Sequence, residues 1–350
     1  MSFSEIDTKL TPTQESAVAS IKDVAQQAGV STTTVSRVLS SPDAVRAPLR
    51  LRVEQAIAAL AYRPNLAARR LRQQRSSIIG LIVSDMRSPF FTDLGRAVED
   101  VAYQHGLRLI ICNTDEDPDK ERAYLELMVD EQVSGVIISP TLDGLRSLKK
   151  SQAWPFPMVL VDRALPDTPI DRVLLDNTTA ARRLTEHLLD AGYRRIAALA
   201  GARSTTGQDR QAGYAEAMRA HGLAPLQTWV APTVDAGFAA ATTLLTSAEP
   251  PDALLATNGL LLMGALQAIQ AAGLRSPQDI GLAGFDNNDW TALPTLDVTV
   301  IAQPTYEIGR TAAELLMQRL AEPTRPARGV VLEGVLLARG STRRPSPLNA

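Results

Sequence analysis

The chain has 350 residues, a hydrophobic fraction of 45%, a charged fraction of 21% and a net charge of −2, which is ordinary for a soluble globular protein. This length is enough for a large two-lobed body and a small additional domain. The single cysteine, Cys112, excludes an intramolecular disulfide, and three histidines leave little for a metal site. Residues 1–20 have no apolar run, so we expect a disordered lead-in rather than a secretory signal, and a cytoplasmic protein without a membrane span.

Charge is distributed unevenly along the chain. Residues 21–76 hold ten basic and three acidic side chains, a net charge of +7, whereas the sequence after residue 76 carries −7. A basic head on an acidic body indicates that only the head meets a polyanion such as nucleic acid. A solvated helical face is the alternative, but it does not explain why acids are scarce in this segment alone.

The segment "IKDVAQQAGVSTTTVSRVLS" predicts two short helices joined by a tight turn. Apolar residues follow a helical spacing from Ile21 to Ala28, and Gly29 suits the left-handed position that ends a helix. Ser31 is a good N-cap for the second helix. Together these elements predict a helix-turn-helix, in which the second helix reads base edges in the major groove.

The second helix begins with threonines, which are mediocre helix formers. We expect Thr32 and Thr33 to face outward, where each offers a base a hydroxyl or a methyl group. Arg37, one turn later, has the side chain for a bidentate pair with guanine. The alternative is a helical hairpin with exposed polar residues. A third helix is predicted from about Pro48 to Leu60.

These segments, with "YRPNLAARRLR" and "IIGLIVSDMRSPFF", resemble the LacI/GalR family of bacterial transcriptional regulators. The resemblance extends from Ile21 to about Thr342. It implies that residues 65–72 form a hinge helix that orders on operator DNA, with Leu71 wedged into the central base step. The DNA-binding candidates are Thr32, Thr33, Thr34, Arg37, Asn65, Ala68, Arg69 and Leu71.

Two positions depart from the family's pattern. The family usually has Val-Ser before the third helix, where this chain has Val45 and Arg46, so a serine cap is lost. A phosphate contact from Arg46 would offset that loss. The family generally has Asp after the asparagine at 258, where this chain has Gly259, which puts the bracing of that loop in doubt.

After Ser77 the pattern changes to buried apolar strands that alternate with amphipathic helices, which predicts parallel sheets covered on both faces. Two such runs predict two lobes. The resemblance implies a periplasmic-binding-protein-like core with three crossovers, near Asp176, Gln303 and Arg328. The fold class is therefore an all-α helix-turn-helix head plus an α/β two-lobed core with parallel sheets. The expected domains are a lead-in (1–20), the helix-turn-helix (21–64), the hinge helix and linker (65–77) and the core (78–344), with an N-lobe (78–176 and 304–327) and a C-lobe (177–303 and 328–344).

Polar and aromatic residues gather where these strands end, which is where parallel sheets bind ligands. Carboxylates, amides, an arginine and aromatic rings between two lobes suit a sugar. The resemblance adds that positions matching Phe90, Arg210, Asn258 and Asp286 contact the effector. The effector-binding candidates are Phe90, Phe91, Asp162, Arg163, Ser204, Thr206, Arg210, Asn258, Asp286, Trp290 and Gln303. For Asp85 and Asp176 we favour the role of strand-end cap or inter-lobe brace.

The stretches "FDNNDWT" and "VIAQPTYEIGR" look like those of regulators of sugar-acid use, including regulators that respond to 2-ketogluconate. A sugar acid needs a cation in the cleft, for which Arg163, Arg203 and Arg210 are available. The alternatives are a nucleoside, or a neutral sugar or purine that acts as a corepressor.

The sequence thus predicts a transcriptional repressor that binds a palindromic operator as a homodimer under control of a sugar or sugar acid. No leucine-heptad tail follows "ARGSTRRPSP", so we expect no tethered tetramer. An enzyme is the rival class, but no nucleophile elbow, Walker loop or metal motif is present, so no catalytic residue, metal or cofactor is expected. A solute-binding protein would share the body fold but would have no use for the basic head.

Overall fold

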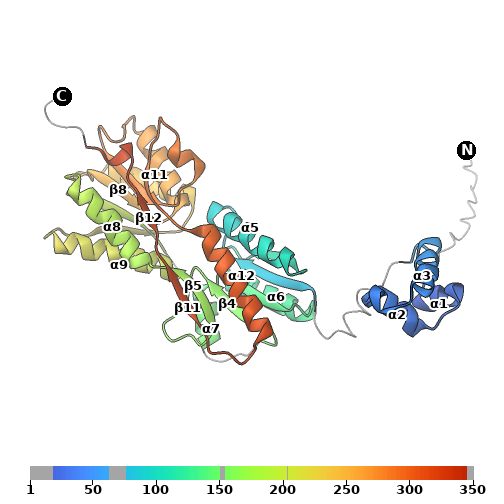
Figure 1. The fold of residues 1–350 in the computed structure, drawn as a ribbon. Coiled ribbons are helices and arrows are strands. Elements are labelled where there is room, and N and C mark those ends of the chain that lie inside the picture. The colour runs from blue at the N-terminus through green and yellow to red at the C-terminus, as the bar shows by residue number, and fades with distance from the viewer. Residues whose placement is uncertain (1–18, 63–75, 150–153, 203, 345–350) are drawn as a thin grey trace, which may run out of the picture. The chain divides into compact units, whose positions relative to one another are not determined.

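The computed structural model describes residues 19–62, 76–149, 154–202 and 204–344. Contacts divide the chain into two units, Met1–Gln74 and Arg75–Ala350 (Figure 1), and each is described by itself. The expected lead-in and the expected hinge helix at 65–72 lie outside the described residues.

The first unit is a small helical domain. Its elements are α1 (Ile21–Ala28), α2 (Thr32–Ser40), the 3₁₀ turn η1 (Pro42–Ala44) and α3 (Ala47–Ala59). Gly29 ends α1 with a φ of 62°, the left-handed conformation expected there. Val24, Val35 and Val53, one from each helix, are fully buried and form the centre of the domain. The helix-turn-helix prediction is confirmed.

The second unit contains two sheets of six strands. In spatial order the N-lobe sheet consists of β11 (Gly329–Leu332), β5 (Asp171–Leu175), β4 (Met158–Val161), β3 (Gly135–Ile138), β1 (Ile78–Val83) and β2 (Arg108–Asn113). The C-lobe sheet consists of β12 (Val335–Leu337), β10 (Thr299–Ala302), β9 (Gly281–Phe285), β8 (Ala253–Ala256), β6 (Ile196–Gly201) and β7 (Leu226–Val230). Neighbouring strands are parallel except for β10 and β12, which are antiparallel.

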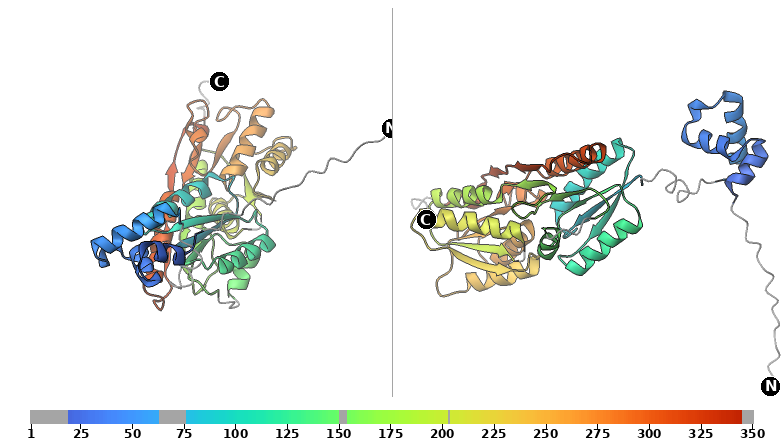
Figure 2. Two further views of the ribbon diagram at one scale, coloured as in Figure 1. Left: turned by 90° about the vertical axis from the view of Figure 1, so that its right-hand side faces the viewer. Right: turned by 90° about the horizontal axis from the view of Figure 1, so that it is seen from below.

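Helices cover both faces of each sheet, as continuous apolar strands require. In the N-lobe, α5 (Pro89–Gln104) and α12 (Thr305–Ala321) cover one face (Figure 2), and α6 (Pro118–Asp130) and α7 (Leu142–Lys149) the other. In the C-lobe, α8 (Asn177–Asp190) and α9 (Thr205–Ala220) pack on one face, and α10 (Val234–Leu245) and α11 (Gly259–Ala271) on the other. Two short 3₁₀ turns, η2 (Asp289–Ala292) and η3 (Gly340–Thr342), complete the C-lobe. The predicted two-lobed α/β core is confirmed.

The third passage between the lobes lies later than the sequence predicted. We expected it near Arg328, with the C-lobe resuming at residue 328. Instead β11 pairs with β5, from Gly329 opposite Arg172 to Leu332 opposite Leu175, so the N-lobe continues to Leu332 and the chain passes to β12 afterwards. Val330 and Leu332 pack against the apolar N-lobe core, which explains why the strand stays with that lobe.

Candidate functional site

The outward face of α2 carries the side chains expected to read bases. Thr32, Thr33 and Arg37 are exposed. Thr34 differs, because its backbone N–H donates to Ser31 Oγ at 3.1 Å and its hydroxyl lies 2.9 Å from the same atom. Thr34 is half-buried and serves the helix cap, so Thr32, Thr33 and Arg37 form the free surface of this helix.

Arg52 links α3 to α1, whereas Arg46 makes no capping bond at the start of α3. The Arg52 Nη2 donates to the carbonyls of Ala28 and Gly29, at 2.5 and 3.2 Å, and so satisfies the C-terminal end of α1. Arg46 occupies the N-cap of α3 and makes no side-chain capping bond. The serine cap missing from the sequence therefore has no substitute within the described residues. Asn65, Ala68, Arg69 and Leu71 lie outside them.

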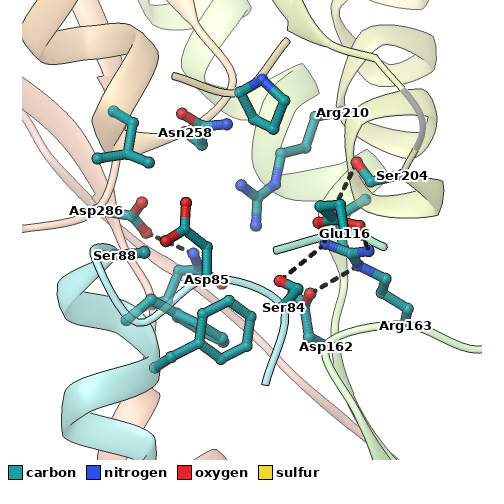
Figure 3. A pocket seen from close by; sticks show the side chains of 16 residues that line it. Ser84, Asp85, Ser88, Glu116, Asp162, Arg163, Ser204, Arg210, Asn258 and Asp286 are labelled. Atoms are coloured by element: carbon teal, nitrogen blue, oxygen red, sulfur yellow. Dashed lines mark hydrogen bonds and ion pairs between the residues drawn. The ribbon is translucent and has the colours of Figure 1, made fainter. Parts of the chain in front are cut away.

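A cavity between the two lobes brings together ten of the eleven predicted effector-binding residues (Figure 3). The predicted residues in its lining are Phe90, Phe91, Asp162, Arg163, Ser204, Thr206, Arg210, Asn258, Asp286 and Gln303. Ser84, Asp85, Ser88, Glu116, Pro232 and Leu260 also line it and were not among the effector-binding candidates. The two phenylalanine rings meet edge to face, with centroids 5.0 Å apart, and form the aromatic part of the lining.

Trp290 is the exception, because it does not line this cavity. It belongs to η2 and packs, partly buried, against the apolar cluster beneath α10 and α11. The chain turns into a 3₁₀ helix directly after Asn288, which takes the indole away from the cavity lining. The aromatic contribution to the cavity comes from α5 instead.

Local backbone conformation aims three carboxylates into the cavity. Glu116, Asp162 and Asp286 have φ values of 61°, 66° and 76°, in the left-handed region that non-glycine residues seldom adopt. Strained positions of this kind concentrate at functional sites. Each of the three follows a strand end, as expected for ligand sites of parallel sheets.

Three helices also begin at the cavity. Their N-caps are Ser88 for α5, Ser204 for α9 and Asn258 for α11. Ser204 and Asn258 accept backbone N–H groups of their own helices, whereas Ser88 makes no side-chain capping bond. Helix N-termini carry partial positive charge, so they favour oxygen-rich ligands in the cavity.

Arg163 is buried and its charge is compensated by protein. Its Nη atoms donate to both carboxylate oxygens of Glu116, at 2.5 and 2.7 Å, and its Nε donates to Asp162 at 3.1 Å. Burial alone lowers the pKa of Arg163, but the bond to Glu116 and the charges of both acids leave that pKa above its ordinary value. This network makes Arg163 a brace for the two acids rather than a free cation.

Arg210 is held differently, by neutral groups. Its Nε donates to Asn177 Oδ1 at 2.7 Å, its Nη1 donates to the Thr257 carbonyl at 2.6 Å, and its guanidinium lies 4.1 Å from the Phe285 ring centroid. Burial lowers its pKa, and the charge of Asp286 opposes that change. Within the described residues it takes part in no ion pair, and its Nη2 has no hydrogen-bond partner. A ligand oxygen can therefore bind there.

Asp286 completes the floor of the cavity. It accepts the Gly259 N–H at 2.8 Å and the Gln303 Nε2–H at 2.6 Å. A Cβ at position 259 would lie 2.8 Å from Asn288 Nδ2 and 3.0 Å from Asp286 Oδ2. The loop that the sequence left in doubt is thus braced by the backbone N–H of Gly259.

Asp176 and Asp85 are the two acids that we expected to act as strand-end caps or inter-lobe braces. Asp176 is the N-cap of α8 and accepts the Thr179 N–H at 3.0 Å, which confirms the capping role. Asp85 forms an ion pair with Arg87 at 2.8 Å and also lines the cavity. Within the described residues, no group of three or more His, Cys, Asp or Glu side chains has the geometry to hold a metal ion.

Comparisons with known proteins agree with this geometry. The family model of the periplasmic binding proteins and sugar binding domain of the LacI family matches residues 76–331. That of the bacterial regulatory proteins of the lacI family matches residues 20–65. The chain belongs to the LacI family. Among the described residues, no helix is both long and apolar enough to span a membrane.

Individual relatives match along almost their whole length. The transcriptional regulator KdgR of Bacillus subtilis is 34% identical over 330 residues, which cover 92% of this chain and 97% of KdgR. The regulator PtxS of Pseudomonas plecoglossicida is 34% identical over 336 residues, covering 95% and 98%. The crystal structure of the Lac repressor dimer bound to operator and the anti-inducer ONPF aligns with a TM-score of 0.82 at 27% identity, covering 93% of this chain and 99% of that one.

Proposed function

We propose that this LacI-family protein is a transcriptional repressor that binds a two-fold symmetric operator as a homodimer. A small polyhydroxylated effector in the inter-lobe cavity would lower its affinity for the operator. The protein would act in the cytoplasm, where bacterial DNA lies. The observation that carries the proposal is that one chain combines a DNA-reading helix with free Thr32, Thr33 and Arg37 side chains and a polar cavity between two lobes. A solute-binding protein would need only the second feature.

A dimer is supported by apolar residues on two corresponding sheet edges. β2 and β7 each occupy the same end of their sheet's strand order. Ile111 on β2 is 44% exposed and Trp229 on β7 is 45% exposed. Large apolar side chains on open sheet edges favour burial against a second copy.

The charges in the cavity favour a neutral effector over a sugar acid. Four carboxylates line it, whereas the two lining guanidiniums are Arg163, which is already paired twice, and Arg210. Carboxylates only accept hydrogen bonds, so the effector must bring donors, and hydroxyl groups supply them. A sugar acid such as 2-ketogluconate would add another negative charge, with Arg210 as its counter-ion.

A matched pair of ligands tests this choice. D-fructose and 2-keto-D-gluconate differ only at C1, which is a hydroxymethyl group in one and a carboxylate in the other. In thermal unfolding of the full chain, a compound that binds should add about 2.7 kcal/mol of stability at 100 times its dissociation constant, and we expect this of D-fructose or D-ribose but not of 2-keto-D-gluconate. If 2-keto-D-gluconate alone stabilised the protein, the effector would be a sugar acid and our choice of a neutral effector would be wrong. If no polyhydroxylated compound stabilised the protein, this part of the proposal would be wrong.

Selection of binding sites from a pool of random DNA duplexes tests the proposed sequence-specific binding to an operator. We expect a two-fold symmetric consensus that retains the protein against a large excess of random DNA. Arg37→Ala should weaken binding to that consensus by about 1–3 kcal/mol per lost base contact without changing the melting temperature. Leu71→Ala, which lies outside the described residues, should also weaken operator binding while leaving effector affinity unchanged. A protein that bound no preferred sequence would be inconsistent with the proposal.

A further inference from the structure

We infer that Asn177 is a positioning residue of the effector site, although it does not line the cavity. It holds the Arg210 guanidinium in the orientation that presents Nη2 to a ligand. This inference rests on the proposed function, because it concerns how the same cavity binds its effector. It assigns a role at the first passage between the lobes, where β5 of the N-lobe ends and α8 of the C-lobe begins.

Both ends of the Asn177 amide are used, on opposite sides of that passage. Its Oδ1 accepts the Arg210 Nε–H at 2.7 Å, and its Nδ2 donates to the carbonyl of Leu175, the last residue of β5, at 3.3 Å. The side chain is only 5% exposed, so water does not substitute easily for either partner. The orientation of Arg210 is thereby tied to the end of an N-lobe strand.

The remaining contacts of Arg210 leave a single orientation. The Phe285 ring limits the guanidinium on one face, and the Thr257 carbonyl fixes Nη1. With Nε on Asn177 and Nη1 on Thr257, Nη2 is the guanidinium nitrogen that has no protein partner within the described residues (Figure 3 shows Arg210 directed into the cavity). Removing the amide acceptor would free the plane to rotate.

The backbone around this pair is closely packed. A Cβ at Gly213, one turn after Arg210 on α9, would lie 2.1 Å from the Thr178 carbonyl. The two helices therefore approach each other with no room for a side chain, which holds Asn177 and Arg210 at a fixed separation. A small shift of α8 at the passage between the lobes must then also move Arg210.

Substitutions at Asn177 can remove the hydrogen-bond acceptor and donor of its amide together, or remove the donor alone. Asn177→Ala removes both. Asn177→Asp keeps an acceptor for Arg210 but loses the donor to Leu175. Asn177→Ser, whose hydroxyl is too short to reach Nε, replaces the alanine variant if that variant fails to fold. Asn113→Ala is the matched control, because Asn113 is also hydrogen-bonded through its side chain, to the Met86 N–H and Asp115, but lies away from Arg210.

The readout is the Arg210 Nε–H signal in ¹⁵N-arginine NMR spectra of the full chain, assigned by its absence in Arg210→Lys. We expect solvent exchange of this proton to be at least about tenfold faster in Asn177→Ala than in wild type, because a bond to a charged donor is lost. Exchange should stay slow in Asn177→Asp and in Asn113→Ala. A lower melting temperature in Asn177→Ala with unchanged Nε–H exchange would mean a structural role only and would overturn the inference. Equally fast exchange in the alanine and aspartate variants would overturn it too.

Titration with D-ribose, D-fructose and 2-keto-D-gluconate separates this inference from the proposed function. A compound that moves the wild-type Arg210 signal should bind Asn177→Ala at least about tenfold more weakly. Equal affinity for the two proteins would overturn the positioning role. If none of the three moves the signal, the proposed ligand class fails, while the exchange comparison still decides the role of Asn177.

Discussion

Glu121 on α6 makes the stability of the N-lobe depend on pH. Its carboxylate is 2% exposed and accepts the Thr141 N–H at 2.5 Å, beside the Pro140 carbonyl to which Arg163 donates. Burial raises the pKa of Glu121 from 4.5 to about 7. The bond from Thr141 and the charge of Arg163 oppose this rise, whereas the charge of Glu116 adds to it. Glu121 therefore supports the loop behind the cavity while carrying a charge that the interior disfavours.

The sign of the effect follows from proton binding. Between pH 4.5 and about 7 the folded chain holds a proton on Glu121 that the unfolded chain has released, so stability falls as the pH rises through this range. The difference between the two pKa values corresponds to about 3 kcal/mol of unfolding free energy. Glu121→Gln removes this dependence and keeps an oxygen that can accept from Thr141. Wild type and variant should have similar stability near pH 4.5, and the variant should be the more stable by up to about 3 kcal/mol at pH 8.

Urea unfolding of both full-length proteins at pH 5 and pH 8 measures this difference. Glu126→Gln is the matched control, because Glu126 lies on the same helix but is exposed. The control should change stability equally at the two pH values. If Glu121→Gln and Glu126→Gln gave the same pH dependence as each other, the argument from burial would be wrong.

Three further substitutions test other parts of the structure. Ser31→Ala removes the N-cap of α2 and should destabilise that helix by about 1 kcal/mol, seen as faster amide hydrogen exchange at Thr34; unchanged exchange would contradict the cap. Gly264→Ala places a Cβ 2.3 Å from the Val234 carbonyl, so α10 and α11 must separate, and we expect a loss of about 1–3 kcal/mol in thermal unfolding. Trp229→Asp puts a charge on the exposed edge of β7 and should shift sedimentation toward the monomer with little loss of secondary structure. A fully dimeric variant would exclude this edge from the interface.

The local features of the head could be predicted because each depends on neighbouring residues. Gly29 ends a helix for reasons of backbone conformation, and Ser31 caps the next helix through a bond three residues away. The role of Thr34 was less evident, because the same hydroxyl suits a base contact and a cap bond. The geometry of the helix start shows the cap contact, and the base contact stays a prediction.

Only part of the cavity lining could be predicted, because the lining depends on which strand ends lie next to each other in the fold. The rule that ligands bind at the carboxyl ends of parallel strands found Asp162 and Asp286. The same rule applied to "ICNTDED" would have found Glu116, which instead emerged as the partner of Arg163. We expected Trp290 to line the cavity because it is close in sequence to Asp286. That closeness does not determine the direction of its side chain, which belongs to a 3₁₀ turn. The position of the third passage depends on pairing between β11 and β5, whose paired residues are about 160 positions apart, and no local pattern encodes such a pairing.

The left-handed backbone at Asp162 and Asp286 has a consequence for how such a cavity changes during evolution. Asparagine tolerates this conformation about as well as aspartate, whereas β-branched and bulky residues do not. At Asp162, whose described bonds all fall on Oδ2, exchange of Oδ1 for an amide nitrogen would alter the charge offered to a ligand and turn an acceptor into a donor without changing the chain path. A cavity built this way can change the ligands that it accepts through single substitutions while the fold stays the same.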